Sequence, residues 1–392
     1  MDRAAYLAFD RFPSAKGAAT HIAQMADALF EHYGGGRLIV AGAPELPAWQ
    51  REQNVEIHRA RMSGATPLAR ALSYANFAAQ VLARKPPEVV HYRDIWSGIA
   101  VERACPPATR RVFEVNGLPS IEWAERYPAL ADSTLAKLRA LEAQQLAAAD
   151  RIIVPAATIA HNLARWNVEL PPLTVVPNGA DLPELPSGPP PLATPYILYF
   201  GALQAWQGVA DAIAAMAMLA DLRGLMLVIA SSSPERHAEA LQNTAQRLGV
   251  AGRILWLYEL PRPQLVRWIA GARCSVAPFT QCARNLLQGF APLKVLESLA
   301  AGVPVVASDL PAVREIVRHG EHGLLVRPER PGELARALRT LLDDAARRDR
   351  LGCAARQHVA DNFSWRLSRA RLSEAYRALH VVKPAQLAEF KR

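Results

Sequence analysis

The chain has 392 residues, of which 51% are hydrophobic and 21% charged, and its formal net charge is +9. This composition is typical of a folded protein with room for two domains, and it excludes a disordered chain. Four cysteines without a C-x-x-C pair exclude a disulfide framework and a structural metal site, and they favour a reducing compartment. No apolar run approaches the roughly 20 residues of a membrane span, and the first residues form no leader, so we expect a cytoplasmic protein.

The excess of positive charge favours association with polyanions. Nucleic acid is disfavoured as a partner because the arginines are dispersed and form no known nucleic-acid-binding pattern. Residues 68–85 form a basic, amphipathic, aromatic-bearing stretch at helical spacing. We interpret this stretch as a surface helix packed on its own sheet. The second interpretation is peripheral contact with the inner face of a membrane.

Short apolar runs alternate with Ala- and Leu-rich stretches, a pattern that predicts parallel sheets with helical crossovers. In the first half the predicted strands are 4–9, 37–41, 89–92, 111–115, 151–154 and 174–176. In the second half they are 196–201, 225–230, 254–257, 274–277, 303–308 and 323–326. We therefore expect an α/β protein with two doubly wound, Rossmann-like domains.

A proline-rich segment divides the two halves. Residues 182–195 contain six prolines, too many for a helix or a central strand. We predict an N-terminal domain over 1–181, a linker over 182–195 and a C-terminal domain over 196–362.

The first candidate ligand loop contains Gly17, which lies between a strand and a helix. A glycine there allows the backbone to approach a ligand without a Cβ in the way. The loop is not the G-x-G-x-x-G dinucleotide pattern, because Ala15 and Thr20 occupy positions that would need glycine. His21 follows on the first turn of the helix, where a histidine more often packs or caps than reacts.

The most informative stretch is 292–309. Pro292 suits a helix start, an apolar stripe follows it, Gly302 ends the helix, and an apolar strand comes next. The free amides and positive dipole end of such a helix favour an anion such as a diphosphate. Glu297 lies about one turn further in, where its carboxylate can accept hydrogen bonds from ribose hydroxyls.

At this point the sequence resembles the retaining GT-B glycosyltransferases of family four. The resemblance rests on six segments in the family's order, which span almost the full chain. They are 9–21 with its glycine loop, 114–122, 176–181, 199–203, the helix and strand of 292–309, and 311–328.

The resemblance implies a GT-B fold in which two Rossmann-like domains face each other across a cleft, with the final helix, 365–380, returning to the first domain. It also implies a metal-independent hexosyltransferase without a cofactor, active in polysaccharide biosynthesis. Such an enzyme moves a sugar, with retention, from a nucleoside-diphosphate sugar to a hydroxyl of a glycan, a lipid-linked acceptor or a small molecule. The alternative is a non-catalytic, nucleotide-sugar-binding partner subunit on the same fold.

The family's pattern is incomplete on the donor side. Relatives carry an arginine and a lysine in the loop after the first strand of the second domain, where this chain has Ala202 and Gln207, and Gly289 replaces the first glutamate of the usual pair. Losing two charge-assisted hydrogen bonds to phosphate would cost several kcal/mol. We expect Lys294 and Arg284 to replace the missing cations. The predicted donor-binding residues are Gly17, Gly201, Tyr258, Arg284, Ala291, Pro292, Leu293, Lys294 and Glu297.

On the acceptor side, Asn116 stands where many relatives have a histidine. An amide can orient a sugar hydroxyl but cannot relay a proton, so general acid–base catalysis is not expected there. Arg93 and Asp94 end a strand at its carboxyl edge, the side where open sheets bind ligands. The predicted catalytic residues are Asn116 and Lys294, and the acceptor-side residues are His21, Arg93, Asp94 and Glu122.

Overall fold

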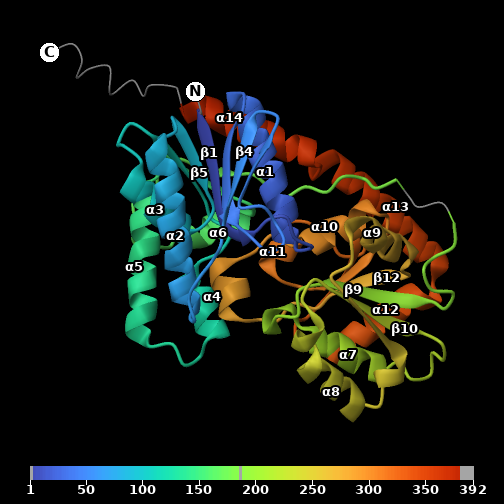
Figure 1. Cartoon of the computed structure of the whole chain (residues 1–392). Helices are drawn as coiled ribbons and strands as arrows, with labels where there is room; N and C mark the ends of the chain where they lie inside the picture. The colour runs from blue at the N-terminus through green and yellow to red at the C-terminus, as the bar shows by residue number, and fades with distance from the viewer. Residues whose placement is uncertain (1–2, 185–187, 380–392) are drawn as a thin grey trace. The chain divides into compact units, whose positions relative to one another are not determined.

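The computed structural model describes residues 3–184 and 188–379, which group by their contacts into two units (Figure 1). The first unit contains residues 3–14, 18–177 and 368–379, and the second contains residues 15–17 and 178–367 apart from the undescribed stretch. The division after Pro177 lies slightly before the expected boundary at 181. Residues 185–187 of the expected linker, residue 380 of the expected last helix and the tail beyond it lie outside the described residues.

The first unit is built on an eight-stranded sheet in the order β3-β4-β2-β1-β5-β6-β7-β8. All neighbouring strands are parallel except β3 and β4, which pair antiparallel at one edge. The strands are β1 (Ala4–Arg11), β2 (Gly36–Ala41), β3 (Trp49–Glu52), β4 (Val55–Ala60), β5 (Val89–Tyr92), β6 (Arg110–Glu114), β7 (Arg151–Val154) and β8 (Leu173–Val175).

The sequence prediction missed β3 and β4, so its six strands for this half were too few. β3 is almost entirely exposed, and half of the β4 side chains are polar or charged. Neither segment forms the continuous apolar run that identifies a strand covered on both faces.

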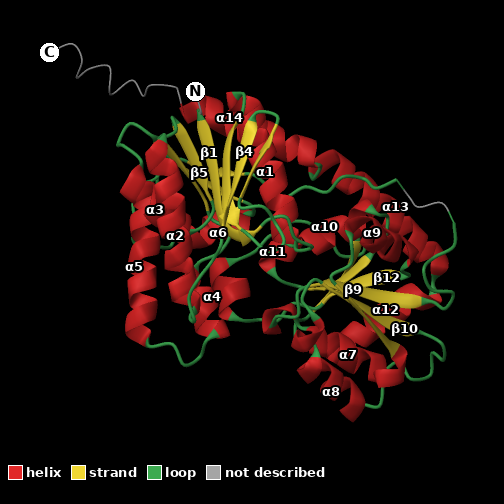
Figure 2. Ribbon diagram, viewed as in Figure 1, coloured by secondary structure: helices red, strands yellow, loops and turns green. Residues whose placement is uncertain are grey.

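Helices cover both faces of the first sheet (Figure 2). α2, α3 and α5 lie side by side against one face, and α1 lies on the other (Figure 1). From Ser368 onward, α14 packs beside α1, where His32 Nδ1 lies 2.9 Å from Ser373 Oγ. The helices are α1 (Gly17–Tyr33), α2 (Pro67–Arg84), α3 (Ile95–Ala104), α4 (Pro119–Arg126), α5 (Asp132–Ala148), α6 (Ala157–Leu163) and α14 (Trp365–Leu379).

α2 is the basic amphipathic helix of the sequence analysis. Thr66 caps its start, and its apolar residues Ala71, Tyr74, Ala78 and Leu82 are buried. The apolar face is thus used within the first unit, as the interpretation of a helix packed on its own sheet requires. No helix among the described residues is long and apolar enough to cross a membrane.

The second unit contains a six-stranded sheet in the order β11-β10-β9-β12-β13-β14, with every neighbouring pair parallel. Its strands are β9 (Tyr196–Gly201), β10 (Met226–Ser231), β11 (Ile254–Tyr258), β12 (Cys274–Ala277), β13 (Val305–Ser308) and β14 (Gly323–Val326). All six lie within one or two residues of the predicted ranges because each is a short, mainly apolar run.

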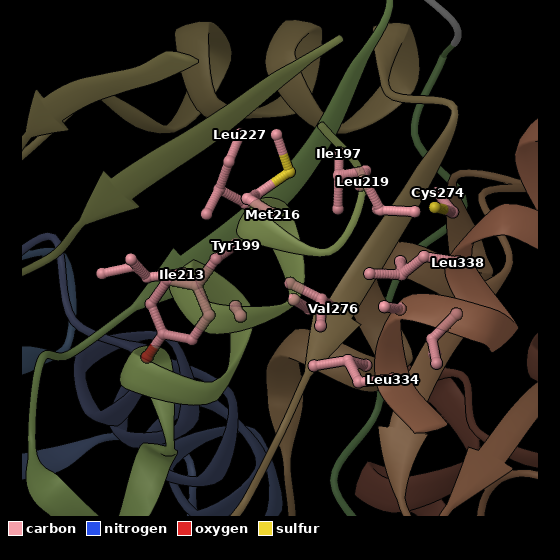
Figure 3. Close-up of a cluster of buried hydrophobic side chains, with 14 of the residues drawn as sticks. Ile197, Tyr199, Ile213, Met216, Leu219, Leu227, Cys274, Val276, Leu334 and Leu338 are labelled. Atoms are coloured by element: carbon pink, nitrogen blue, oxygen red, sulfur yellow. The ribbon is translucent and has the colours of Figure 1, made fainter. Parts of the chain in front are cut away.

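Along β9, successive side chains pack into hydrophobic cores on opposite faces of the second sheet. Ile197 and Tyr199 of β9 pack with α7 and α12 (Figure 3), whereas Leu198 and Phe200 pack on the opposite face with Ile269 of α9. The helices of the second unit are α7 (Val209–Ala217), α8 (Glu239–Arg247), α9 (Arg262–Gly271), α10 (Leu293–Ala300), α11 (Pro311–Arg314), α12 (Pro331–Asp343) and α13 (Ala345–Asn362). Short helical turns lie at η1 (Ala205–Gln207), η2 (Glu235–His237), η3 (Ala251–Arg253) and η4 (Arg284–Gln288).

Each sheet has one point where the strand order reverses. In the first sheet the chain runs outward from β1 through β2 and then returns to β5 on the other side of β1. In the second sheet the same reversal separates β9 from β12. Open α/β sheets bind ligands outside the carboxyl ends of the strands at such points.

Candidate functional site

The carboxyl edge of the first sheet gathers polar residues from the adjacent strands β1, β5 and β6. After β5, the Arg93 guanidinium donates to Asp10 Oδ2 of β1 at 3.0 Å. Asp94 accepts from the backbone N–H of Phe9 at 2.7 Å and caps α3 by accepting from the N–H of Ser97 at 2.8 Å. Burial raises the pKa of Asp94 to about 6. Asp94 therefore joins the ends of two strands, and Arg93 is paired with a carboxylate at the strand-order reversal.

Glu114, the last residue of β6, is a completely buried carboxylate at this edge. Its Oε1 accepts hydrogen bonds from His21 Nε2 and Asn116 Nδ2, and its Oε2 accepts from the Tyr6 hydroxyl at 2.9 Å. His91 Nε2 lies 3.0 Å from Oε2 without forming a directed hydrogen bond. A buried charge is tolerated only when donors surround it, and Glu114 meets that condition.

The electrostatics follow from this geometry. Burial raises the pKa of Glu114, but His21 and His91 outweigh burial and hold that pKa well below its usual value. Burial and the charge of Glu114 raise the pKa of the Tyr6 hydroxyl. Glu114 is therefore ionised at neutral pH, and Tyr6 remains a neutral donor to it.

The network also reaches α14. The Tyr376 hydroxyl lies 2.6 Å from His91 Nδ1, and both side chains are fully buried. α14 is thereby linked to β5, the strand that precedes Arg93 and Asp94.

The segment after β6 leads into α4, which carries Glu122. The Glu122 carboxylate folds back over the loop, so that a Cβ added to Gly117 would lie 3.1 Å from Glu122 Oε2. The start of α4 is held by buried Glu142 of α5, which accepts from the N–H of Ser120 at 2.7 Å. Burial raises the pKa of Glu142 to about 7.

The carboxyl edge of the second sheet is formed around Gly201, the last residue of β9. Gly201 has φ +126°, a conformation that other residues rarely adopt, and a Cβ there would lie 3.0 Å from Lys294 Nζ. Lys294 is the second residue of α10, and helical side chains lean toward the N-terminus of their helix. Its ammonium thus lies between the start of α10 and the end of β9.

The ammonium of Lys294 is enclosed. It donates to Gln207 Oε1 at 2.6 Å and lies 4.0 Å from the centre of the Tyr199 ring. Burial lowers the pKa of Lys294 well below its usual value; Arg284 lowers it further, and Glu297 opposes them. In the described part of the chain, the hydrogen-bond partner of this cation is a neutral amide, which leaves its charge only partly compensated.

Glu297 lies one turn further along α10. Its Oε1 accepts a hydrogen bond from Arg262 Nη1 at 2.5 Å, and its side chain is 9% exposed whereas that of Arg262 is 52% exposed. Burial raises the pKa of Glu297, and Arg262 and Lys294 oppose that shift. The carboxylate is therefore held by one half-exposed arginine that can turn into solvent.

The other predicted donor residues surround the start of α10. Pro292 is the N-cap, no side chain of the described residues caps the first turn, and the Ala291 carbonyl accepts from Asn178 Nδ2 at 3.0 Å. The Arg284 guanidinium lies 5.5 Å from the ring centres of Trp206 and Phe290.

Tyr258 ends β11, and Gln242 Nε2 donates to its hydroxyl at 3.1 Å. No group of three or more His, Cys, Asp or Glu side chains suited to a metal ion occurs among the residues that the structure describes.

Two family models each match one part of the chain. The model "Glycosyltransferase Family 4" matches residues 15–184, and the model "Glycosyl transferases group 1" matches residues 194–344. The chain belongs to this family of glycosyltransferases.

Among curated family members, the D-inositol 3-phosphate glycosyltransferase of Corynebacterium glutamicum is 35% identical over 191 residues, which are 47% of this chain and 44% of that protein. The glycogen synthase of Mycobacterium tuberculosis is 27% identical over 299 residues, 74% of this chain and 69% of that protein. The chain spans about half the length of the first curated relatives that it matches.

Solved structures of glycosyltransferases share the fold. Sucrose-phosphate synthase from Thermosynechococcus elongatus has a TM-score of 0.79 at 18% identity, covering 96% of this chain and 98% of that one. HepE from Anabaena, solved with UDP and glucose, has a TM-score of 0.72 at 17% identity, covering 96% and 100%. The predicted GT-B fold class is confirmed.

The structure brings several of the predicted site residues together and places others in the second unit. His21, Asn116, Arg93 and Asp94 lie at the first carboxyl edge. Gly201, Lys294 and Glu297 lie around the start of α10 in the second unit. Gly17 begins α1 and groups with the second unit.

Sequence reasoning missed the partners that hold these side chains, above all Glu114, His91 and Arg262. A signal for the first two was available. Glu114 and His91 each follow two apolar residues of a predicted strand, and an ionisable side chain in the buried part of a strand implies a partner. Arg262 lies 35 positions before Glu297 and carries no such signal.

Proposed function

We propose that this protein is a retaining glycosyltransferase that moves a sugar from a nucleoside-diphosphate sugar to a hydroxyl acceptor. The donor would bind at the second carboxyl edge and the acceptor at the first. Family membership supports the reaction class, and the side chains at the two edges support the assignment of substrates.

The observation that carries this proposal is the enclosure of the Lys294 ammonium at the start of α10, between the Gln207 amide and the Tyr199 ring. Lys294 places a partly buried amino group next to the N-terminal turn of a helix, whose dipole also favours negative charge. A buried cation with a neutral partner is costly, and a diphosphate would compensate it. We assign Lys294, the amides near residues 291–293 and Arg284 to the diphosphate.

The remaining donor contacts follow from position. Gly201 leaves room beside Lys294 that any side chain would fill. Glu297 would accept hydrogen bonds from the ribose hydroxyls after Arg262 turns away. Tyr258 ends a neighbouring strand and would meet the base. Gly17 would admit the diphosphate.

In the reaction, the bond from the anomeric carbon to the diphosphate oxygen breaks, and a bond to the acceptor oxygen forms on the same face of the sugar. The acceptor proton passes to the departing diphosphate, so no side-chain base is required. Lys294 would stabilise the charge that grows on the leaving group. Asn116 would orient a hydroxyl, and Arg93, Asp94 and Glu122 would line the acceptor side.

The donor nucleotide and the acceptor are suggested by relatives. HepE was solved with UDP and with UDP-glucose, and curated relatives are named for inositol phosphate and glycogen. We therefore propose incubation with UDP-, GDP- and ADP-glucose, each with D-inositol 3-phosphate, glycogen or water as the acceptor, followed by mass spectrometry. A glycosylated product supports the transferase, and donor binding without any turnover overturns it in favour of a partner subunit. Turnover that persists with EDTA supports metal-independent chemistry.

A lipid-linked acceptor would bring the protein to a membrane surface. Leu68 and Leu72 of α2 are 39% and 38% exposed and flank Arg70, so they would meet that surface. Co-flotation with vesicles containing phosphatidylglycerol supports this contact, and its absence restricts the acceptor to soluble glycans or small molecules.

A further inference from the structure

We infer that Glu114 is a positioning residue that fixes the amide of Asn116, so that its carbonyl oxygen faces the acceptor site. The inference rests on the proposed transferase function for its kinetic consequences. It concerns whether the NH₂ or the carbonyl oxygen of Asn116 faces the acceptor, and therefore whether the acceptor must accept or donate a hydrogen bond.

The orientation follows from the chemistry of the partner. A carboxylate only accepts hydrogen bonds, so the group of Asn116 that meets Glu114 Oε1 must be the NH₂. The opposite end of the amide is then Oδ1, which only accepts. Asn116 is partly exposed, whereas Glu114 is completely buried. The accepting end is therefore the one that a ligand at this edge would meet.

Glu114 is itself held in place and cannot turn to release the amide cheaply. His21 donates to the same oxygen that binds Asn116, and Tyr6 donates to the other. Rotation of the carboxylate would break three hydrogen bonds in a fully buried setting. The donors therefore fix Glu114, and Glu114 fixes Asn116.

The consequence is a requirement on the acceptor. A carbonyl oxygen selects a group that donates, such as the hydroxyl of a sugar or polyol. Accepting that O–H orients the hydroxyl without removing its proton, which leaves proton transfer to the departing diphosphate.

The first test needs no turnover. In protein labelled with ¹⁵N at asparagine, the Asn116 NH₂ signals, identified by their absence in Asn116→Ala, should exchange slowly with solvent. Glu114→Gln should abolish that protection. Rapid exchange in the unaltered protein would overturn the inference whether or not the protein transfers sugar.

The second test uses the acceptor that the protein accepts among inositol 3-phosphate, glycogen and water, with UDP-glucose as the donor. Glu114→Gln should lower kcat/KM for the acceptor about 10-fold or more, with donor affinity unchanged. In the Asn116→Ala background the same substitution should have little further effect, because Glu114 acts through Asn116. An equal loss in both backgrounds would show a structural role only. Glu31→Gln, which removes an exposed carboxylate of α1 in the same unit, should leave the acceptor KM within about twofold.

If Glu114→Gln does not fold, Asn116→Asp leaves the network intact. Two facing carboxylates repel, so one of them should take up a proton as the pH falls. Once protonated, the carboxyl group introduced by this substitution donates to Glu114 and presents its carbonyl oxygen, as asparagine does. The rate of this variant relative to the unaltered protein should rise between pH 8 and pH 5.5, and a flat ratio would overturn the inference. Absence of turnover by the unaltered protein would instead overturn the proposed function, leaving the exchange measurement to decide the orientation of Asn116.

Discussion

At the carboxyl edge of the first sheet the enclosed charge is the fully buried anion of Glu114, whereas at the edge of the second sheet it is the partly buried cation of Lys294. Glu114 ends β6, the strand next to the reversal between β1 and β5, and Lys294 lies beside the end of β9, where the second sheet reverses. Glu114 accepts from Tyr6, His21 and Asn116, whereas Lys294 donates to the neutral amide of Gln207. The comparison teaches that a buried charge completed by its own chain serves to hold other groups in place. A buried charge with an incomplete set of partners is prepared for a ligand.

The largest expected effect is on stability at the first edge. Glu114→Gln should lower the free energy of unfolding by about 3–5 kcal/mol, because it leaves buried donors without their anion. The pKa of Glu114 is lowered in the folded state, so its contribution is fully present above the ordinary carboxyl pKa of 4.5. The contribution is lost as the pH falls from there through the lower folded value. Urea unfolding from pH 7 to pH 3 measures this; Glu333→Gln, in an exposed ion pair, should show no comparable loss.

At the carboxyl edge of the second sheet, a substitution should lower the rate of sugar transfer and leave stability unchanged. Lys294→Met should slow sugar transfer about 100-fold or more, because the charge on the leaving group grows in the transition state. Thermal stability should not fall, since the substitution removes a buried charge with a neutral partner. Kinetics and thermal unfolding test the two halves of this expectation, with exposed Lys137→Met as the control. Gln207 Oε1 lies 2.6 Å from Lys294 Nζ, so a lysine there could supply the missing charge. Gln207→Lys in the Lys294→Met protein should therefore restore part of the rate of transfer. Transfer at the original rate in Lys294→Met would mean that the phosphate site lies elsewhere.

Next in size is the effect of Glu297. Glu297→Ala should weaken nucleotide binding by about 1.5–3 kcal/mol if the carboxylate accepts from both ribose hydroxyls. Arg262, which donates a hydrogen bond to Glu297, provides the matched control. Arg262→Ala should change affinity by less than about 1 kcal/mol, in the direction of tighter binding, because a half-exposed ion pair is weak. Calorimetric titration with the nucleotide measures both, and unchanged affinity in Glu297→Ala would remove the ribose assignment.

The smallest expected effect is the uptake of protons by Lys294 when the nucleoside diphosphate binds. Its folded pKa is lowered, and a bound diphosphate would raise it toward the ordinary value of 10.5. Binding of the nucleoside diphosphate should therefore take up protons and weaken as the pH rises through the folded pKa, by at most about 1.4 kcal/mol per pH unit. Titrations in buffers of different ionisation enthalpy detect this uptake. The nucleoside alone should show none, and proton release on diphosphate binding would contradict the assignment.

The sequence predicted most of the second unit and less of the first. Strands such as β12 and β13 are buried apolar runs, and the start of α10 is marked by Pro292 and ended by Gly302, so local rules suffice. The position of Lys294 beside Gly201 also follows from the lean of helical side chains. β3 is an edge strand and β4 is its neighbour, and neither forms a continuous apolar run, so rules based on the local sequence miss them.

The network around Glu114 could not be predicted because its members are remote in sequence. His21 of α1 and His91 of β5 meet at the Glu114 carboxylate, and Tyr376 of α14 joins through His91; no pattern in the sequence states that these elements come together. Sequence could indicate that a charge on β6 needs partners, but only the topology selects them. The same holds for Arg262 and Glu297, which meet because α9 and α10 lie on the same face of the second sheet.

The central claim is that the two edges bind different substrates. Its most direct test is to measure, for Lys294→Met and Asn116→Ala in parallel, the dissociation constant of the donor by titration and the KM of the acceptor by steady-state kinetics. The account predicts that Lys294→Met raises the donor constant and leaves the acceptor KM unchanged, and that Asn116→Ala does the reverse. If both variants change the same constant, the assignment of donor and acceptor to separate edges is wrong.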